Sequence, residues 1–292
     1  MFTAGPFKLA FHRPVLMGII NVTPDSFSDG GETPTAILAI ERGKQMVAAG
    51  ADWLDIGGES TRPGAKSVSV GEELKRVVPV IQGLRDAGVP LSIDTYHVEV
   101  AKEAIDAGAV ILNDILGGRD LALAALAAEH DLPYIAMHMQ GEPRTMQQAP
   151  HYDDVVAEVF AWLGLQVERL KAEGVRQVLV DPGIGFGKTL AHNLMLLKQL
   201  DWFLELGSPI VIGTSRKSWI NKVLGGPIPI SERLPGTIAS SVLALEKGAR
   251  VFRVHDIPEN LIALKAAWGI LTAERLEGDD PVKWSPVVKR AE

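Results

Sequence analysis

The sequence predicts an α/β protein with a single domain, a (β/α)8 TIM barrel. Short apolar runs rich in β-branched residues recur about eight times along 292 residues. Each run is followed by a polar cluster and then by a longer stretch with helical spacing, which is typical of this barrel. A doubly wound open sheet is the alternative. Polar clusters after every strand, and the lack of a complete dinucleotide fingerprint, favour the barrel.

The apolar runs are expected to be strands buried on both faces, because they do not alternate with polar residues. In order they are Val15–Ile20, Trp53–Ile56, Leu91–Ile93, Val110–Leu112, Tyr134–Met137, Val178–Val180, Ile210–Ile212 and Val251–Val254. The carboxyl ends of parallel barrel strands share one face, so the polar residues that follow these runs should meet there.

The stretches between the strands carry apolar residues at spacings of three and four, as helices with one buried face do. The clearest stripes are Val155, Val159, Leu163, Val167 and Leu170, and then Leu261, Leu264, Trp268 and Leu271. Glycines stand where helices should end, at Gly50, Gly88, Gly108 and Gly174. Thr237 is the expected start of a helix that ends near Gly248.

No shift in composition divides the chain, so we expect one barrel domain over residues 1–277. Residues 278–292 are expected to form a surface tail, because acidic residues and prolines cluster there.

Composition excludes several classes of protein. The chain has no cysteine, which rules out disulfides, thiolate zinc sites and cysteine nucleophiles. Its net charge of −7 argues against a nucleic-acid partner. No stretch of about 18 apolar residues occurs, and the N-terminus lacks the pattern of a signal peptide. We therefore expect a soluble, cytoplasmic protein with no membrane partner.

Two tempting motifs are rejected. Residues 183–189 resemble a phosphate-binding P-loop, but Pro182 stands where its first glycine should be and the spacing is one residue short. None of the seven histidines forms a two-histidine helical pair. The histidines expected to be surface or packing residues are His12, His130, His151 and His192.

The predicted strand ends carry two kinds of chemistry. Asp94, Asn113 and Asp181 suit a neutral ring with amide-like donors and acceptors, because a carboxylate can accept two N–H bonds from an amino-pyrimidine edge. The cations and small donors suit a polyanion such as pyrophosphate; they are Arg62, Lys217, Arg253 and His255. The sequence therefore predicts a ligand with a heterocyclic end and an anionic end. Structural ion pairs at the barrel rim are the alternative.

Seven segments in order give the chain a resemblance to the dihydropteroate synthases, from about Leu16 to Leu271. The segments are residues 18–30, 55–64, 92–95, 137–141, 181–188, 215–218 and 253–256. Members of this family join 6-hydroxymethyl-7,8-dihydropterin pyrophosphate to 4-aminobenzoate and release pyrophosphate. The resemblance implies a TIM barrel, a homodimer, bound Mg²⁺, sensitivity of the family to sulfonamides and, for want of a companion domain, a monofunctional chain. Residues 115–118 are less uniform in the family and receive no role.

The resemblance also implies residue roles. The pterin would contact Asp94, Asn113, Met137, Asp181, Phe186 and Lys217. Pyrophosphate would contact Asn21, Arg62, Arg253 and His255, with Asn21 also binding Mg²⁺. The 4-aminobenzoate pocket would contain Phe27, Thr61, Pro63 and Ser215. Catalysis would rest on Asp94, Lys217, Arg62 and Arg253.

Two alternatives stay open. A pterin-dependent methyltransferase barrel would share Asp94, Asn113 and Asp181, but would not need the cationic segments around Arg62 and Arg216. A catalytically silent paralogue that binds a pterin or a partner protein is the other.

Overall fold

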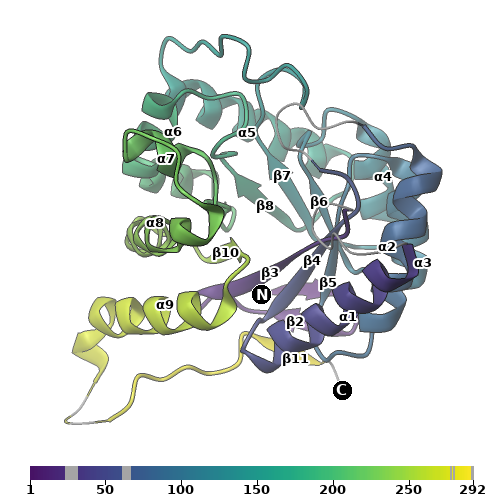
Figure 1. Ribbon diagram of the computed structural model, residues 1–292, viewed down its shortest axis with the longest axis horizontal. Coiled ribbons are helices and arrows are strands. Elements are labelled where there is room, and N and C mark those ends of the chain that lie inside the picture. Colours follow the sequence, from purple (N-terminus) through teal and green to yellow (C-terminus); the bar gives the residue numbers. More distant parts are fainter. Residues whose placement is uncertain (24–31, 61–66, 277, 279, 291–292) are drawn as a thin grey trace.

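The computed structural model describes residues 1–23, 32–60, 67–276, 278 and 280–290, and its centre is a parallel barrel ringed by helices (Figure 1). The barrel strands are β3 (Val15–Asn21), β4 (Trp53–Gly57), β5 (Leu91–Asp94), β6 (Ile111–Asp114), β7 (Tyr134–Met137), β8 (Val178–Asp181), β9 (Val211–Ile212) and β10 (Val251–Val254). Hydrogen bonding runs in the order β8-β7-β6-β5-β4-β3-β10-β9. A parallel bridge between Val180 and Ile210 joins β8 to the segment before β9 and closes the ring. The predicted TIM barrel is therefore confirmed.

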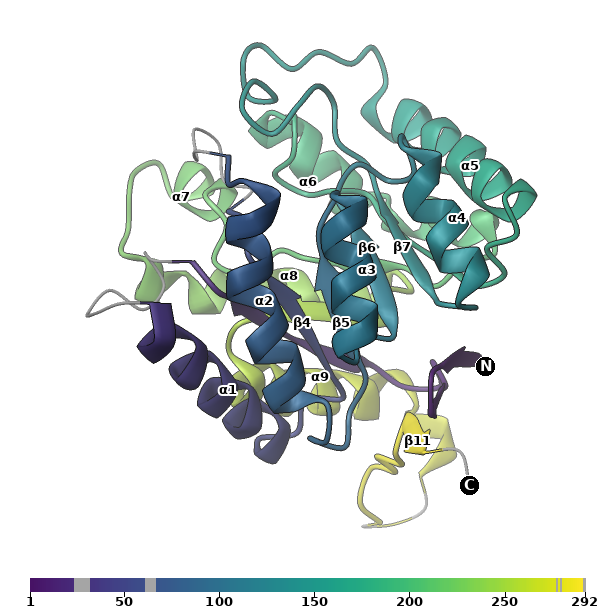
Figure 2. The same ribbon diagram turned by 90° about the vertical axis from the view of Figure 1, so that its right-hand side faces the viewer.

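Helices connect successive strands. They are α1 (Glu32–Ala48), α2 (Val70–Leu84), α3 (Val98–Ala107), α4 (Leu121–Glu129), α5 (Val155–Ala172), α6 (Leu190–Lys198), α7 (Trp219–Val223), α8 (Leu234–Glu246) and α9 (Ile257–Leu271). Short 3-10 turns are η2 (Leu200–Leu206), η3 (Ile230–Arg233) and η4 (Ala273–Arg275). Within the described residues, no helix is long and apolar enough to cross a membrane. Figure 2 shows α2 and α3 side by side in front of β4 and β5.

Short polar side chains begin several of these helices. Ser69 caps α2 by accepting from the Glu72 amide at 3.3 Å, and Asp154 caps α5 by accepting from two amides at 3.0 Å. The expected start at Thr237 is wrong, because α8 begins three residues earlier, at Leu234. Thr237 instead lies inside the first turns of the helix, where its hydroxyl accepts from the Arg216 amide at 3.0 Å.

The core has two layers. The outer layer lies between the strands and the surrounding helices, and the stripe on α5 belongs to it. The inner layer lies inside the barrel, toward the end where the strands begin, and most strands contribute to it. Its side chains include Met17, Trp53, Ile135 and Leu179. This dense inner layer closes the barrel at that end, so only the opposite end, where the strands finish, can open toward a ligand.

A small antiparallel sheet covers the closed end, and the sequence did not indicate it. It contains β1 (Phe2–Ala4), β2 (Phe7–Leu9) and β11 (Val288–Arg290), in the order β1-β2-β11. Figure 2 shows β11 beside the N-terminus, away from the mouth of the barrel. The expected surface tail over 278–292 is thus corrected at its end, since β11 pairs with β2 and Val287 is only 1 % exposed.

Candidate active site

The predicted pterin-binding polar side chains meet at the open end of the barrel. Asp94 ends β5, and its register partner Asn113 stands one residue before the end of the neighbouring strand β6. Asp181 ends β8, and Lys217 lies beyond β9. A Cβ atom added to Gly213 would lie 3.8 Å from Lys217 Nζ, 3.9 Å from Asp181 Oδ2 and 3.9 Å from Arg253 Cβ. Residues far apart in sequence therefore share one small space.

Asp55 lies at the base of this space and was given no role by the sequence. It is fully buried on β4 and accepts hydrogen bonds from Arg253 Nε at 2.6 Å, Asn113 Nδ2 at 3.1 Å and the Ser92 hydroxyl. Ser92 in turn accepts from Trp53 Nε1 at 2.8 Å. Asp55 therefore orients both an arginine and an asparagine of the predicted site. The sequence did contain one signal for this role: Asp55 is a carboxylate inside an otherwise apolar strand.

Burial shifts the pKa values of Asp94 and Asp181, two carboxylates near Arg253. Burial raises the pKa of Asp94 to about 7, although the nearby guanidinium of Arg253 opposes this. Burial also raises the pKa of Asp181, against the charge of Lys217 and a hydrogen bond of 2.7 Å from the Gly183 amide. For Arg253 itself burial lowers the pKa, but Asp55 and Asp94 outweigh burial and the pKa is raised. Asp94 can therefore exist in either protonation state near neutral pH.

A strained turn positions Lys217. Arg216 has a φ of 58°, in the left-handed region that disfavours side chains other than glycine. Its Nε donates to Asp256 at 2.9 Å, and Arg233 donates to its carbonyl at 2.9 Å. Lys217 Nζ then reaches the Ile184 carbonyl and lies 4.6 Å from the centre of the Phe186 ring. Burial lowers the pKa of Lys217 to about 8, against the charge of Asp181.

An apolar wall stands beside the polar groups. Met137 is 5 % exposed at the end of β7, and Phe186 packs against the same cluster. The other members are Ile115, Met139, Met146, Tyr96 and Leu116. Ile115 and Leu116 thus have a packing role in a segment to which the sequence assigned none. Flat apolar side chains beside convergent hydrogen-bonding groups form a slot suited to a small heterocycle.

Lys188 belongs to the rejected P-loop-like segment, yet it is 1 % exposed and lies beside this wall. Its Nζ lies 2.9 Å from His138 Nδ1 and donates to the Phe186 carbonyl at 2.9 Å. Burial lowers the pKa of Lys188 well below its usual range and lowers that of His138 to about 2. The pair therefore holds the segment carrying Phe186, a structural use that the motif did not reveal.

The predicted anion-binding residues are only partly described. Ser215 Oγ lies 3.0 Å from His255 Nδ1, which places a residue expected in the 4-aminobenzoate pocket against one expected at pyrophosphate. Asn21 ends β3 with a half-buried side chain. Four of the predicted site residues lie outside the described residues; they are Phe27, Thr61, Arg62 and Pro63.

A polar cavity of about 150 Å³ lies next to Lys188. Its lining residues are Gln147, Gly185, Lys188, Asn193, Ser218, Trp219 and Lys222. Gly185 also lies close to Lys217, since a Cβ atom added there would lie 3.2 Å from Lys217 Cδ. Ser218 and Lys222 were not among the predicted site residues, because neither lies at a strand end.

The chain matches a known family over most of its length and superposes on solved structures. Residues 17–255 match the family described as "Pterin binding enzyme". The dihydropteroate synthase of Escherichia coli K12 is 46 % identical over 271 residues, which cover 91 % of this chain and 95 % of that protein. The sulfonamide complex of the Yersinia pestis dihydropteroate synthase superposes with a TM-score of 0.87 at 42 % identity, covering 93 % and 99 % of the two chains. The Xanthomonas albilineans enzyme with 4-aminobenzoic acid gives 0.85 at 42 % identity, covering 92 % and 99 %.

The barrel and the family match over residues 17–255 thus define the class: the chain is a pterin-binding enzyme. The high identity over nearly the whole length of both chains narrows this further. The chain belongs to the dihydropteroate synthase family and is a transferase.

Proposed function

We propose that this protein condenses 6-hydroxymethyl-7,8-dihydropterin pyrophosphate with 4-aminobenzoate to give 7,8-dihydropteroate and pyrophosphate. One observation carries the proposal: Asp94, Asn113, Asp181 and Lys217 converge beside the Met137 wall at the open end of the barrel. That grouping supplies acceptors, donors and an apolar face together, as a bicyclic pterin requires.

The pterin is held by carboxylates on its amino-pyrimidine side. Asp181 accepts N–H bonds from that edge, and Asn113 offers both a donor and an acceptor. Lys217 supplies a cation near the ring, while Met137 and Phe186 contact the ring faces. Asp55 does not touch the pterin and acts by orienting Asn113 and Arg253.

The pyrophosphate end is assigned to Asn21, Arg62, Arg253 and His255. Asn21 offers a single amide oxygen, which fits Mg²⁺ because this ion binds few protein oxygens and completes its shell with phosphate oxygens and water. Asn21 would hold the ion, which when bound neutralises charge on the leaving pyrophosphate. The guanidinium groups pair with phosphate oxygens, and His255 is held in place by Ser215.

The reaction follows a dissociative path. The bond between the pterin methylene carbon and the pyrophosphate oxygen breaks, and the electron pair leaves with the oxygen. Ionised Asp94 stabilises the positive charge left on the pterin and methylene, while the arginines stabilise the departing oxygens. The amine of 4-aminobenzoate then bonds to the methylene carbon and loses a proton to solvent. No strong general base is needed, because an aniline nitrogen is unprotonated at neutral pH.

The 4-aminobenzoate pocket is assigned to Phe27, Thr61, Pro63 and Ser215. The bound 4-aminobenzoic acid of the Xanthomonas albilineans relative supports a site for this substrate. The sulfonamide complex of the Yersinia pestis relative supports sulfonamides as ligands of the same chemistry. The cavity near Ser218 and Lys222 adds a polar and a cationic group beside Lys217 for a carboxylate.

Further assignments complete the proposal. We place the protein in the cytoplasm and assign the catalytic unit to one domain over residues 1–277. A homodimer is supported by exposed apolar side chains on α8 and α9, where Leu243, Ile262 and Ile270 are 58 %, 72 % and 77 % exposed. Exposed apolar side chains favour a covering partner where they form one patch, and α8 and α9 pack against each other.

The test is turnover with both substrates and Mg²⁺, followed by release of pyrophosphate and formation of dihydropteroate. We expect product only when all three are present. Pyrophosphate release without dihydropteroate would indicate hydrolysis. Pterin binding without any turnover would identify a silent paralogue, and transfer of a methyl group would identify the methyltransferase alternative; each result would overturn the proposal.

A further inference from the structure

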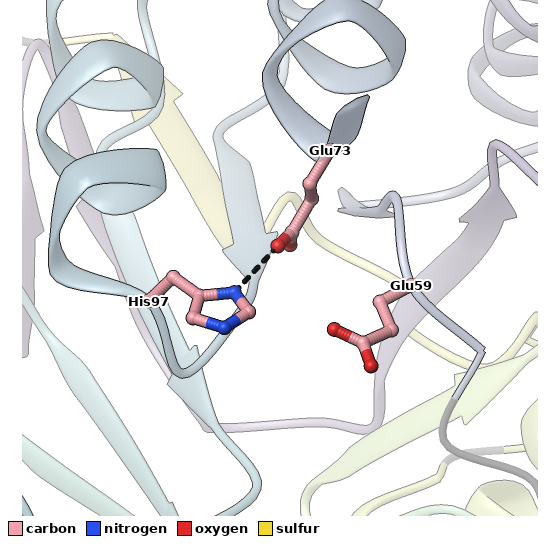
Figure 3. Close-up of side chains that lie close together, drawn as sticks. All are labelled: Glu59, Glu73 and His97. Carbon is pink, nitrogen blue, oxygen red and sulfur yellow. Dashed lines mark hydrogen bonds and ion pairs between the residues drawn. The ribbon is translucent and has the colours of Figure 1, made fainter. Parts of the chain in front are cut away.

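Three potential metal ligands face one another outside the pterin slot. Ligand atoms of Glu59, Glu73 and His97 all lie within 4.8 Å of one another. Figure 3 shows the carboxylates of Glu73 and Glu59 and the imidazole of His97 directed toward a common space. His97 Nδ1 lies 2.8 Å from Glu73 Oε2, and Tyr96 donates to Glu59 Oε2 at 3.0 Å. No other group of this kind occurs among the described residues.

The fold brings the three together from separate elements. Glu59 follows β4, Glu73 lies in the first turn of α2, and His97 directly precedes α3. Because β4 and β5 are neighbours in the barrel, the segments after them and the helices α2 and α3 lie side by side (Figure 2). The cluster is therefore built on rigid parts of the barrel, as a selective site requires.

Glu73 has a buried carboxylate with one oxygen that makes no hydrogen bond. Its side chain is 1 % exposed, one oxygen pairs with His97, and Oε1 accepts no hydrogen bond. A buried carboxylate oxygen with no partner loses its hydration without compensation. Burial raises the pKa of Glu73, with His97 and Thr95 opposing this and Glu59 reinforcing it. A bound cation would satisfy an acceptor that has no hydrogen bond and belongs to a cluster of three potential ligands.

We propose that Glu59, Glu73 and His97 bind one divalent cation of the Zn²⁺ type, at a site separate from the proposed magnesium site at Asn21. The cation would give Glu73 Oε1 a partner and would separate two carboxylates that otherwise repel each other. Nothing in this proposal depends on the synthase reaction.

The donor set selects the metal. One imidazole nitrogen and two carboxylate oxygens match Zn²⁺, which binds both donor types at about 2.0–2.2 Å and commonly keeps a water as its fourth ligand. Mg²⁺ prefers oxygen alone and sheds its water reluctantly, so this site should select against it. Binding requires the three ligand atoms to approach more closely, and rotation of the half-exposed Glu59 side chain can supply that movement.

Occupancy would also link the site to the rest of the protein. Glu59 stands two residues before Thr61 and three before Arg62. A cation shared by Glu59, α2 and α3 would join the end of the β4 segment to these two helices.

The test is calorimetric titration of Zn²⁺ into chelator-treated protein without substrates. We expect wild type to bind one more equivalent than Glu73→Gln or His97→Gln. If a variant retains that equivalent, its affinity should fall by more than the roughly 10- to 100-fold that loss of an outer-shell partner costs. Mg²⁺ should not compete. X-ray absorption spectroscopy at the zinc edge, with one equivalent of Zn²⁺ added, should show nitrogen and oxygen ligands, with Zn–N at about 2.0–2.1 Å.

Two controls sharpen the result. Glu72→Gln changes the adjacent carboxylate, which pairs with Arg76, and should leave zinc binding unchanged. His151→Gln removes an exposed histidine elsewhere and should do the same. Thermal unfolding without metal checks that each variant folds. Equal zinc stoichiometry and affinity in wild type, Glu73→Gln and His97→Gln would overturn the site, and would leave the synthase reaction untouched.

Discussion

Arg253 donates from Nη2 to Oδ2 of Asp94 at 2.7 Å, so a residue assigned to pyrophosphate and one assigned to the pterin form an ion pair. Arg253 Nε also donates to Asp55 at 2.6 Å. Within the described residues, no hydrogen bond uses the third nitrogen, Nη1. The guanidinium is thus anchored by two carboxylates along one edge, and it can offer its remaining N–H groups to a phosphate oxygen without leaving them.

The first prediction separates the charge of Arg253 from its shape. Arg253→Lys keeps the charge, but a single ammonium cannot bridge Asp55 and Asp94 and also reach a phosphate. We expect kcat/KM for the pterin pyrophosphate to fall at least tenfold, with weaker binding of pyrophosphate by calorimetry. Arg250→Lys, at the other end of β10, is the matched control and should retain activity. Full activity in Arg253→Lys would remove this residue from the site.

The second prediction concerns the pterin slot. Asp181→Asn replaces an acceptor by a group that also donates, and leaves the Gly183 amide with a weaker partner. Hydrogen bonds to charged groups contribute about 1.5–3 kcal/mol each, so pterin affinity should fall by more than tenfold. Calorimetry with a pterin measures the loss, and circular dichroism checks the fold. Unchanged affinity would show that Asp181 lies outside the slot.

The sequence predicted the barrel and the meeting of its strand ends, because both follow from periodicity and chain order. It did not predict which side chains pair. Asp55 and Arg253 are separated by 198 positions, and their contact depends on how the barrel closes. The sequence did not predict a P-loop at residues 183–189. The burial of Lys188 against His138 depends on packing that no local sequence pattern encodes. The roles of Arg62 and Phe27 stay predictions, because both lie outside the described residues.

The third prediction tests Asp55 as a positioning residue. Asp55→Asn leaves the partly buried Arg253 with one carboxylate instead of two, and breaking an ion pair whose carboxylate is fully buried costs about 3–5 kcal/mol. Ser92→Ala removes one neutral donor to the same carboxylate and leaves the Trp53 indole N–H without its acceptor, so it should cost about 1–3 kcal/mol. Urea denaturation compares the two. For ligand binding, Asp55→Asn should weaken pterin and pyrophosphate together. Equal stability of the two variants would contradict the proposed anchor.

The fourth prediction concerns the C-terminal segment, where the sequence favoured a tail. Prolines and acidic residues obscured a single buried position, and pairing with β2 joins residues at opposite ends of the chain. Val287→Ala should therefore destabilise the protein by about 2 kcal/mol, the value of two buried methyl-sized groups. Val223→Ala, at a side chain 50 % exposed, should change stability little. If both variants unfold alike, the end of the chain does not contribute to the inner core.

The fifth prediction is the pH dependence of the reaction. Burial raises the pKa of Asp94 to about 7 and lowers that of Lys217 to about 8. Below about pH 7 the free protein lacks the carboxylate that stabilises the cationic pterin, and above about pH 8 it lacks the ammonium. The profile of kcat/KM, which reports the free enzyme, should therefore be a narrow bell with its maximum between these values. Lys217→Arg should move the alkaline limb upward, since arginine stays charged.

The stability of the free protein should change with pH in the direction opposite to its activity: as Asp94 ionises, activity rises and the free energy of unfolding falls. The pKa of Asp94 is higher in the folded protein than the roughly 4 of an unfolded chain, so folding favours its protonated form. Its contribution to the free energy of unfolding is complete below about pH 4 and is lost as the pH rises through about 7. Ionisation of Asp94, which activates the site, thus lowers the free energy of unfolding. Bound substrate should raise that free energy again. Urea denaturation of wild type and Asp94→Asn across this range measures the effect. A flat activity profile from pH 6 to 9 would show that neither group titrates in the functional range.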